Sequence, residues 1–497
     1  MKNYIFKTLL CSALAMTLTT SCELDQYPEG SIPSEKAWQN INDAVKFQNG
    51  LLGSLRGAVG GINFCTTDIQ SDLFNAMAGG GSLGREHQWI FTTSQFAGDN
   101  MWDRNYSLIK SANNVLDNID KIEPQDEEEE AFLNNFKGEA YFARALGYAN
   151  MAPRYCVNYD AATAASSLGM PLVTSVDVNA KPSRATLEAT YNLILSDIEN
   201  AYKLLSDKAD FTVPNKDVVT ALKARVSLYM KNYDEAIEAA TSLFDKYELT
   251  NTDDYQMMWS EDFGTEIIYE PLMTVDERGG SYEGVYIGYN KAKERYAPNY
   301  VPTQGLMDLY EEGDVRKETY FVEYNLTAMD QEEDGYMFMK FPGNSMLRKE
   351  KEDETNSWYN MVKVFRASEM YLIAAEASLM KENADEAAAL GYLNKLRTAR
   401  GASKLNSTGA ALIKDMKNEW TREMVGEGVR LDNLKRWGEG VKRMAPQKFN
   451  QNMLSNRPAE EYTKLNIQPN DPLYYKIIWE IPANDTQANS NLVPNWK

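Results

Sequence analysis

Aromatic side chains are concentrated in two stretches that lack helical periodicity. Trp89 lies in REHQWIFTTSQFAGDN, Trp259 lies in DYQMMWSEDFG, and tyrosines recur between residues 282 and 296. A flat aromatic ring packs against a flat apolar face, such as the C–H face of a sugar, while Asn, Asp, Gln or Arg side chains bind the hydroxyl rim. We predict ligand contacts from Trp89, Trp259, Tyr282, Tyr286, Tyr289 and Tyr296, with Asn75, Arg85, Asp99, Asp276 and Arg278 as polar partners.

The same tyrosines have a second interpretation. Tyr282, Gly284 and Tyr286 follow the period of two that is typical of a strand, so these rings could instead belong to a core. Both interpretations stay open from the sequence.

Catalytic and metal-binding patterns are poorly represented. His87 is the only histidine, which nearly excludes histidine-centred catalysis and histidine-rich metal sites. The 72 acidic residues include no pair that the sequence singles out for glycoside hydrolysis. Asp330, Glu332 and Asp334 resemble the start of a calcium loop, but Phe341 stands where that loop needs a glutamate. We therefore predict no enzyme activity, no cofactor and no metal site, and we interpret the acidic runs as solvated faces, with a single calcium ion on a surface loop left open as the alternative.

Composition limits the partners. The chain has 497 residues, a formal net charge of −21, 25% charged and 43% hydrophobic residues, which is typical of a folded globular protein. No block of Lys and Arg is present, so we predict that nucleic acid is not a partner.

The N-terminus predicts export and a lipid anchor. Lys2 and Lys7 precede an apolar run from Leu9 to Leu18, and no acidic residue occurs before Glu23. This pattern predicts a signal peptide over residues 1–21. Cys22 follows it directly, as in a bacterial lipobox, although Thr19 stands where Leu is usual. We predict lipid attachment at Cys22, with a secreted protein carrying a chance cysteine as the alternative.

Two further cysteines remain in the predicted mature chain. Cys65 and Cys156 would form a disulfide in an oxidising compartment or would stay as two buried thiols. The sequence does not decide between these states.

Apolar stripes at spacings of three and four residues predict amphipathic helices. Such stripes occur within residues 132–147, 187–205 and 219–229. Thr186 and Asp217 are the predicted N-caps of the second and third helices.

An internal repeat links two distant segments. ALKARVSLYMKNYDEA (221–236) aligns with YLIAAEASLMKENADEA (371–387) when one residue is inserted. Each segment predicts a helix, a tight polar turn and a second helix with small residues, as in a tetratricopeptide-like unit. Residues 57–100, 251–305, 325–360 and 445–475 lack this periodicity and are predicted to be irregular insertions.

Several segments, in their order along the chain, resemble the SusD/RagB family of Bacteroidetes lipoproteins. They are WDRNYSLIKSANNVLDNI (102–119), GEAYFARALGYANMAPRYC with GMPLV (138–156, 169–173), ATYNLILSDIENAYKLL (189–205), residues 220–240, VFRASEMYLIAAEA (364–377), YLNKLRTARGA (392–402), TREMVGEGVRLDNLKRWGEG (421–440) and WEIPANDTQANSNLVPNW (479–496). Asp485 stands where the family more often has Glu.

This resemblance implies an all-α fold of tetratricopeptide-like helix pairs with long irregular ligand-binding loops. Residues 22–497 would form a single SusD-like domain, with an N-terminal helical portion (22–250) and a loop-rich C-terminal portion (251–497). The family is non-enzymatic, is lipid-anchored at the outer-membrane surface, and delivers nutrients to a SusC-like TonB-dependent transporter. The resemblance also implies that arginines within residues 421–440 pair with carboxylates and hold the C-terminal helix in place. It further implies that Trp102, Tyr106, Asn113 and Leu116 are core residues.

Three functions remain open. Most proteins that resemble this chain bind glycans, so an oligosaccharide is the predicted ligand. The alternative is peptide capture, as in the RagB branch, and a third possibility is a helical scaffold without a small-molecule ligand.

Overall fold

The computed structural model describes residues 37–81, 83–93, 98–349, 358–449, 453–454 and 465–496. The predicted signal peptide and Cys22 lie outside the described residues. The helices are α2 (Ile41–Ala58), α3 (Ile62–Gln70), α4 (Gly84–Gln88), α5 (Gly98–Asn118), α6 (Glu127–Tyr155), α7 (Leu187–Leu204), α8 (Lys216–Tyr229), α9 (Tyr233–Thr241), α10 (Tyr255–Ser260), α11 (Gln304–Met307), α12 (Val315–Tyr320), α13 (Ala367–Met380), α14 (Glu386–Ala399), α15 (Gly409–Met424), α16 (Arg430–Arg436) and α17 (Ala483–Ala488). The strands are β1 (Phe74–Ala76), β2 (Leu168–Pro171), β3 (Arg184–Thr186), β4 (Ile267–Tyr269), β5 (Tyr289–Asn290), β6 (Arg295–Tyr296), β7 (Tyr300–Pro302), β8 (Phe321–Ala328), β9 (Gln331–Phe338), β10 (Phe365–Arg366), β11 (Val441–Lys442) and β12 (Asn466–Ile467).

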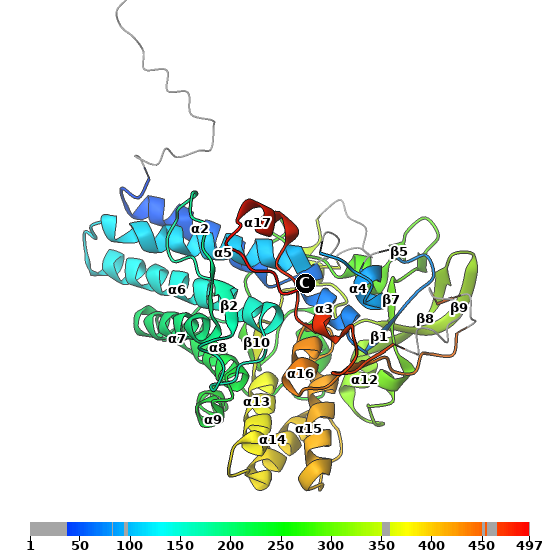
Figure 1. Ribbon diagram of the computed structural model, residues 1–497. Coiled ribbons are helices and arrows are strands. Elements are labelled where there is room, and N and C mark those ends of the chain that lie inside the picture. The colour runs from blue at the N-terminus through cyan, green and yellow to red at the C-terminus, as the bar shows by residue number, and fades with distance from the viewer. Residues whose placement is uncertain are drawn as a thin grey trace, which may run out of the picture.

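Long helices lie side by side in one half of the molecule (Figure 1). α2 packs on α5 and α6, α6 packs on α7, and α7 packs on α8. Phe136, Ala140 and Ala143 of α6 are fully buried, which confirms the amphipathic helix that their spacing predicts. The acidic run before them begins this helix: Asp126 accepts a hydrogen bond from the Glu129 amide at 2.9 Å. The glutamates after Asp126 fill the first turn, where the helix dipole favours negative charge.

One of the two predicted helix caps is correct. The Thr186 hydroxyl accepts from the Ala189 amide at 3.0 Å and begins α7. Asp217 was the wrong residue for α8, because Asn215 already caps that helix. The Asn215 side-chain oxygen accepts from the amides of Asp217 (2.9 Å) and Val218 (3.1 Å), and Asp217 lies in the first turn.

Both segments of the internal repeat form two helices joined by a short turn. These pairs are α8 with α9 and α13 with α14, and α9 packs directly on α13. Phe244 and Tyr371 stack there with ring centroids 3.8 Å apart. Ala236, Ala240 and Ala374 are fully buried, so their small side chains allow close approach of the helices. That these pairs are tetratricopeptide-like units stays a prediction.

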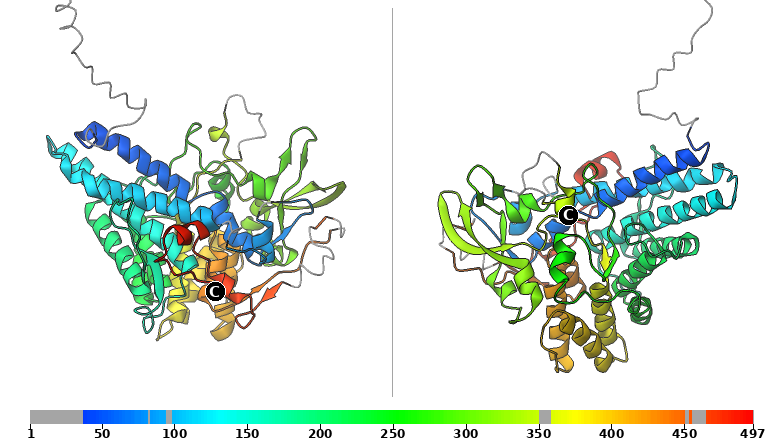
Figure 2. Two further views of the ribbon diagram at one scale, coloured as in Figure 1. Left: turned by 45° about the horizontal axis from the view of Figure 1, so that its top comes forward. Right: turned by 180° about the vertical axis from the view of Figure 1, so that it is seen from behind.

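The fold is mainly helical, as expected, and the other half of the molecule adds short sheets (Figure 2). The longest strands, β8 and β9, pair antiparallel from Phe321 opposite Phe338 to Ala328 opposite Gln331. With β5 and β6 they form a four-stranded sheet in the order β5-β6-β8-β9. This hairpin is hard to recognise in the sequence because acidic residues occupy the outer face of β9. Glu332 and Asp334 are exposed on that face, while Gly335 and Met337 are buried on the other.

Arginine–carboxylate pairs hold the C-terminal helices, as predicted. Arg430 forms two hydrogen bonds to Asp72, at 2.9 and 2.7 Å. Arg436 forms two to Glu376, at 3.0 and 2.7 Å. Each pair joins α16 to a segment far away in the sequence, so these charges position helices and do not face a ligand.

The structure also decides the state of the two cysteines. Cys65 and Cys156 are free and buried, and burial raises the pKa of both thiols. Among the described residues, no helix is both long enough and apolar enough to cross a bilayer.

Candidate functional site

Four partly exposed aromatic side chains meet on the four-stranded sheet and the loop beside it. Tyr289 on β5 and Tyr296 on β6 face each other across the strands, with ring centroids 5.1 Å apart. Tyr296 lies 4.5 Å from Tyr324 on β8, and Tyr289 lies 6.3 Å from Trp358. We call Tyr289, Tyr296, Tyr324 and Trp358 the aromatic platform. These four rings come from three strands and one loop and contact one another in a chain.

Local pairing explains why these rings meet. Antiparallel partners on the same face of a sheet have side chains close enough for ring contacts. β6 then pairs parallel with β8, placing Tyr296 opposite Leu326 and thus near Tyr324. The Ser281 hydroxyl donates to the Trp358 carbonyl at 2.9 Å and ties the loop to the platform.

Polar contacts tie together the strands that carry the rings. Arg295, the neighbour of Tyr296 on β6, forms an ion pair with Glu332 of β9, and the Thr327 hydroxyl donates to the Tyr296 carbonyl at 3.2 Å. Partial burial, followed by the neighbouring tyrosines, raises the pKa of Tyr296 to about 12. Its phenol is therefore neutral at physiological pH and can donate a hydrogen bond. Flat rings with hydroxyl donors at their rim suit a sugar, which has an apolar face and polar edges.

Most of the predicted ligand aromatics are core residues, so these predictions were wrong. Trp89, Trp259, Tyr282, Tyr286 and Asn75 expose 0, 1, 2, 1 and 2% of their surface. Trp89 donates its ring N–H to the Gln70 carbonyl at 2.8 Å. Tyr282 stacks on Phe341 at 4.2 Å, and Tyr286 lies 5.0 Å from both Phe74 and Phe338. A ring enclosed on all sides has no face left for a ligand.

The remaining predicted residues do not form one site. Tyr289 and Tyr296 belong to the platform. Arg85 on α4 and Asp276 in the loop before β5 are exposed. Asp99 is the second residue of α5, and its side chain lies outside the described atoms. Arg278 lies with its guanidinium carbon 4.2 Å from the centre of the Tyr359 ring, next to the platform in sequence.

Sequence reasoning missed Tyr324 and Trp358. Trp358 lies in the SWYN segment of an insertion, where no periodicity ranks one aromatic above another. Tyr324 would have been found by recognising the strand 321–328, since its pairing with Gly335 places it on the face of the sheet opposite to Glu332 and Asp334.

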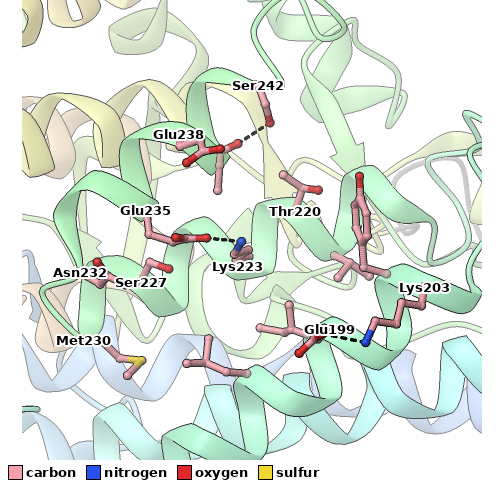
Figure 3. Close-up of a pocket in the computed structure, with 15 residues that line it drawn as sticks. Glu199, Lys203, Thr220, Lys223, Ser227, Met230, Asn232, Glu235, Glu238 and Ser242 are labelled. Atoms are coloured by element: carbon pink, nitrogen blue, oxygen red, sulfur yellow. Dashed lines mark hydrogen bonds and ion pairs between the residues drawn. The ribbon is translucent and has the colours of Figure 1, made fainter.

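A second hollow lies among α7, α8 and α9 (Figure 3). It has a volume of about 610 Å³, an apolar floor and charged walls. Four of its charges form ion pairs: Glu199 with Lys203 at 2.7 Å, and Lys223 with Glu235. Its one aromatic ring, Tyr202, has the Lys216 ammonium 5.6 Å from its centre. This groove has no stacked rings, so the platform is the better candidate for binding a flat ligand.

A mostly helical scaffold that presents aromatic side chains from loops and short strands is the layout of a ligand-binding protein. Two family models match the chain: one described as "Starch-binding associating with outer membrane" matches residues 39–228, and one described as "SusD family" matches residues 265–496. The chain belongs to the SusD family.

Individual relatives agree with this assignment. The SusD-like protein P38 of Formosa agariphila is 24% identical over 493 residues, which cover 87% of this chain and 91% of that protein. A SusD superfamily protein from Bacteroides thetaiotaomicron aligns with a TM-score of 0.76 at 25% identity, covering 92% of this chain and all of that one. A SusD-like carbohydrate binding protein from Bacteroides vulgatus aligns with a TM-score of 0.72 at 21% identity, covering 91% of this chain and 97% of that one, and shows the same fold.

Proposed function

We propose that this protein is a non-catalytic, lipid-anchored binding protein of the outer-membrane surface. It captures oligosaccharides and delivers them to a SusC-like TonB-dependent transporter. The aromatic platform is the observation that carries the proposal, because its partly exposed rings and their hydroxyl groups match the two kinds of surface on a sugar. Membership of the SusD family supports the carbohydrate class.

Weak binding at the platform suits a protein that must release its cargo. Each stacking residue contributes on the order of 0.5–1.5 kcal/mol beyond the burial of area. A few such contacts hold a sugar long enough for transfer and still allow it to dissociate.

Removing two platform rings tests the binding role. We expect the double variant Tyr289→Ala, Trp358→Ala to bind its glycan about tenfold more weakly, because it loses two stacking contacts. A screen of plant, host and microbial glycans beside peptide pools identifies a ligand for the wild type. Titration calorimetry then compares the affinities of the wild type and the variant.

A matched control is Tyr202→Ala, which removes an exposed ring from the distant helical groove and should leave glycan affinity unchanged. Equal affinity of the platform variant and the wild type would remove the platform from the binding site. Capture of peptides with no glycan in the panel would replace the proposed function with peptide uptake.

The proposed anchor has its own test. A Cys22→Ser variant should move from the membrane fraction to the soluble fraction and should lose incorporation of labelled palmitate, because its attachment atom is gone. Membrane retention with no palmitate in the wild type would overturn lipid attachment at this residue.

A further inference from the structure

Three arginines surround a cavity between two long helices and the loop that leads to the platform. The cavity lies between α2, α5 and residues 277–280, and its volume is about 430 Å³. Arg56 comes from α2, Arg104 from α5 and Arg278 from the loop, and Glu277 is the only acidic residue among the lining residues. This local excess of positive charge stands out in a chain whose net charge is −21.

The guanidinium groups are held in place by neighbouring groups. Arg56 pairs with Glu277 and donates to the Leu272 carbonyl at 3.3 Å. Arg104 donates to the Gly57 carbonyl at 3.2 Å. Arg278 donates to the Leu347 carbonyl at 3.2 Å while its plane lies over Tyr359. Each arginine carries five N–H donors, so one or two such contacts orient the group and leave Arg56 and Arg104 with further donors toward the cavity.

Glycines keep the floor of this cavity open. Gly53 and Gly57 are one turn apart on α2 and both line the cavity. A Cβ at Gly53 would lie 3.7 Å from an Arg56 terminal nitrogen, and a Cβ at Gly57 would lie 3.5 Å from Arg104 Nη1. Glycine inside a helix is less stable than alanine. Gly53 and Gly57 lower the stability of α2 in this way. Because they have no side chains, the guanidinium groups of Arg56 and Arg104 stay accessible from the cavity.

The cavity adjoins the aromatic platform through one short segment. Tyr359, which packs against Arg278, follows Trp358 of the platform directly in the chain. Ser281, which follows the cavity-lining Gly280, holds the Trp358 carbonyl. A ligand that stacks on the platform therefore has charged guanidinium groups close to one end.

We propose that the arginine cavity binds the carboxylate of a uronic acid residue, within an oligosaccharide whose other sugars stack on the aromatic platform. The inference rests on the proposed glycan-binding function and names its substrate class. A carboxylate matches the planar fork of arginine, which forms two parallel hydrogen bonds to it. The cavity volume accommodates one sugar ring, and the platform supplies the apolar contacts.

Binding of acidic glycans and of their neutral counterparts tests this assignment. The probes are oligosaccharides of galacturonan, alginate, glucuronoxylan and hyaluronan, each beside its carboxyl-reduced form. The wild type should bind at least one acidic probe about tenfold more tightly than its reduced form, and added NaCl should weaken only the acidic interaction. The double variant Arg104→Gln, Arg278→Gln should lose that preference, while Lys404→Gln, an exposed charge after α14, should keep it.

A pair of glycine variants on one helix sharpens the test. Gly53→Glu places a carboxylate in the cavity, so it should lose acidic-probe binding by tenfold or more. Gly50→Glu adds the same charge one turn earlier, where a Cβ meets nothing within 4 Å, and should bind as the wild type does. Thermal melts confirm that both variants are folded.

The outcomes separate this inference from the proposed function. Binding of neutral glycans only, or acidic binding that the arginine and Gly53 variants leave intact, overturns the uronate assignment and leaves glycan capture standing. Arginine-dependent binding of sulfated glycans or of peptides, with no uronate bound, also overturns it. Failure to bind any glycan overturns the proposed function itself.

Discussion

The variant Arg366→Ala is expected to lower the free energy of unfolding by about 3–5 kcal/mol, because it removes a buried cation that three carboxylates share. Arg366 is fully buried and donates to three glutamates. Its nitrogens lie 2.9 Å from Glu266, 2.5 Å from Glu423, and 2.6 and 2.9 Å from Glu427.

Arg366 belongs to a wider buried ion network. Glu423 also pairs with Arg316 at 2.9 Å and with Arg400 at 2.9 Å, and all four side chains are inaccessible to solvent. Arg316, Arg397 and Arg422 likewise surround Glu419. Removing one member breaks several charge-assisted hydrogen bonds at once, so the loss exceeds that of an ordinary surface pair.

Chemical denaturation of the variant and of the wild type measures this loss. Lys203→Ala is the matched control, since its pair with Glu199 is exposed and should contribute less than about 1 kcal/mol. A change for Arg366→Ala as small as that of the control would show that the network does not stabilise the fold.

The same network makes the free energy of unfolding depend on pH in the acidic range. The surrounding arginines lower the pKa of Glu419 from 4.5 to about 2. The folded state therefore holds this carboxylate ionised where the unfolded chain takes up a proton. Its stabilising contribution is complete above about pH 4.5 and is lost as the pH falls toward about 2.

Replacing Trp259 by alanine should lower the free energy of unfolding by a similar amount. It should not act as a mutation in the ligand-binding site. We expect Trp259→Ala to cost about 3–5 kcal/mol of stability, because it removes a large buried ring. Its ring centre lies 4.4 Å from the Lys340 ammonium and 5.3 Å from both Lys363 and the Arg366 guanidinium. These cations would lose the electron-rich face that they pack against.

Tyr289→Ala is the contrasting variant, because Tyr289 is partly exposed on a short edge strand. Its melting temperature should stay close to that of the wild type while glycan affinity falls. Thermal melts of both variants check this division. If the Trp259→Ala protein were as stable as the wild type but bound glycan more weakly, Trp259 would be a ligand-binding residue and our assignment of it to the core would be wrong.

The helical part of this fold is largely readable from the sequence. The stripe in α6, the Thr186 cap and the arginine–carboxylate pairs of α16 all followed from spacing, residue type or the family resemblance. Helical periodicity is a local property, since residues three and four apart share a face whatever surrounds the helix. The Asn215 cap was missed because two suitable cap residues stand two positions apart, and only the backbone shows which one starts the helix.

The candidate site was less predictable. The sequence marked non-periodic segments that include two platform residues, but it did not separate Tyr289 and Tyr296 from Trp89, Trp259, Tyr282 and Tyr286. All six are aromatic residues in non-periodic segments, and their local patterns are alike. Which ring is enclosed depends on partners from other segments, such as Phe341, which stacks on Tyr282, and Gln70, whose carbonyl accepts from the Trp89 ring N–H.

The sequence by itself determined the helical periodicity and the family, because these depend on residue type and short spacing. The tertiary structure decided which aromatic rings reach the surface, which arginines share a cavity and whether the cysteines pair. Those outcomes depend on contacts between segments up to hundreds of residues apart, and only the packed chain fixes them.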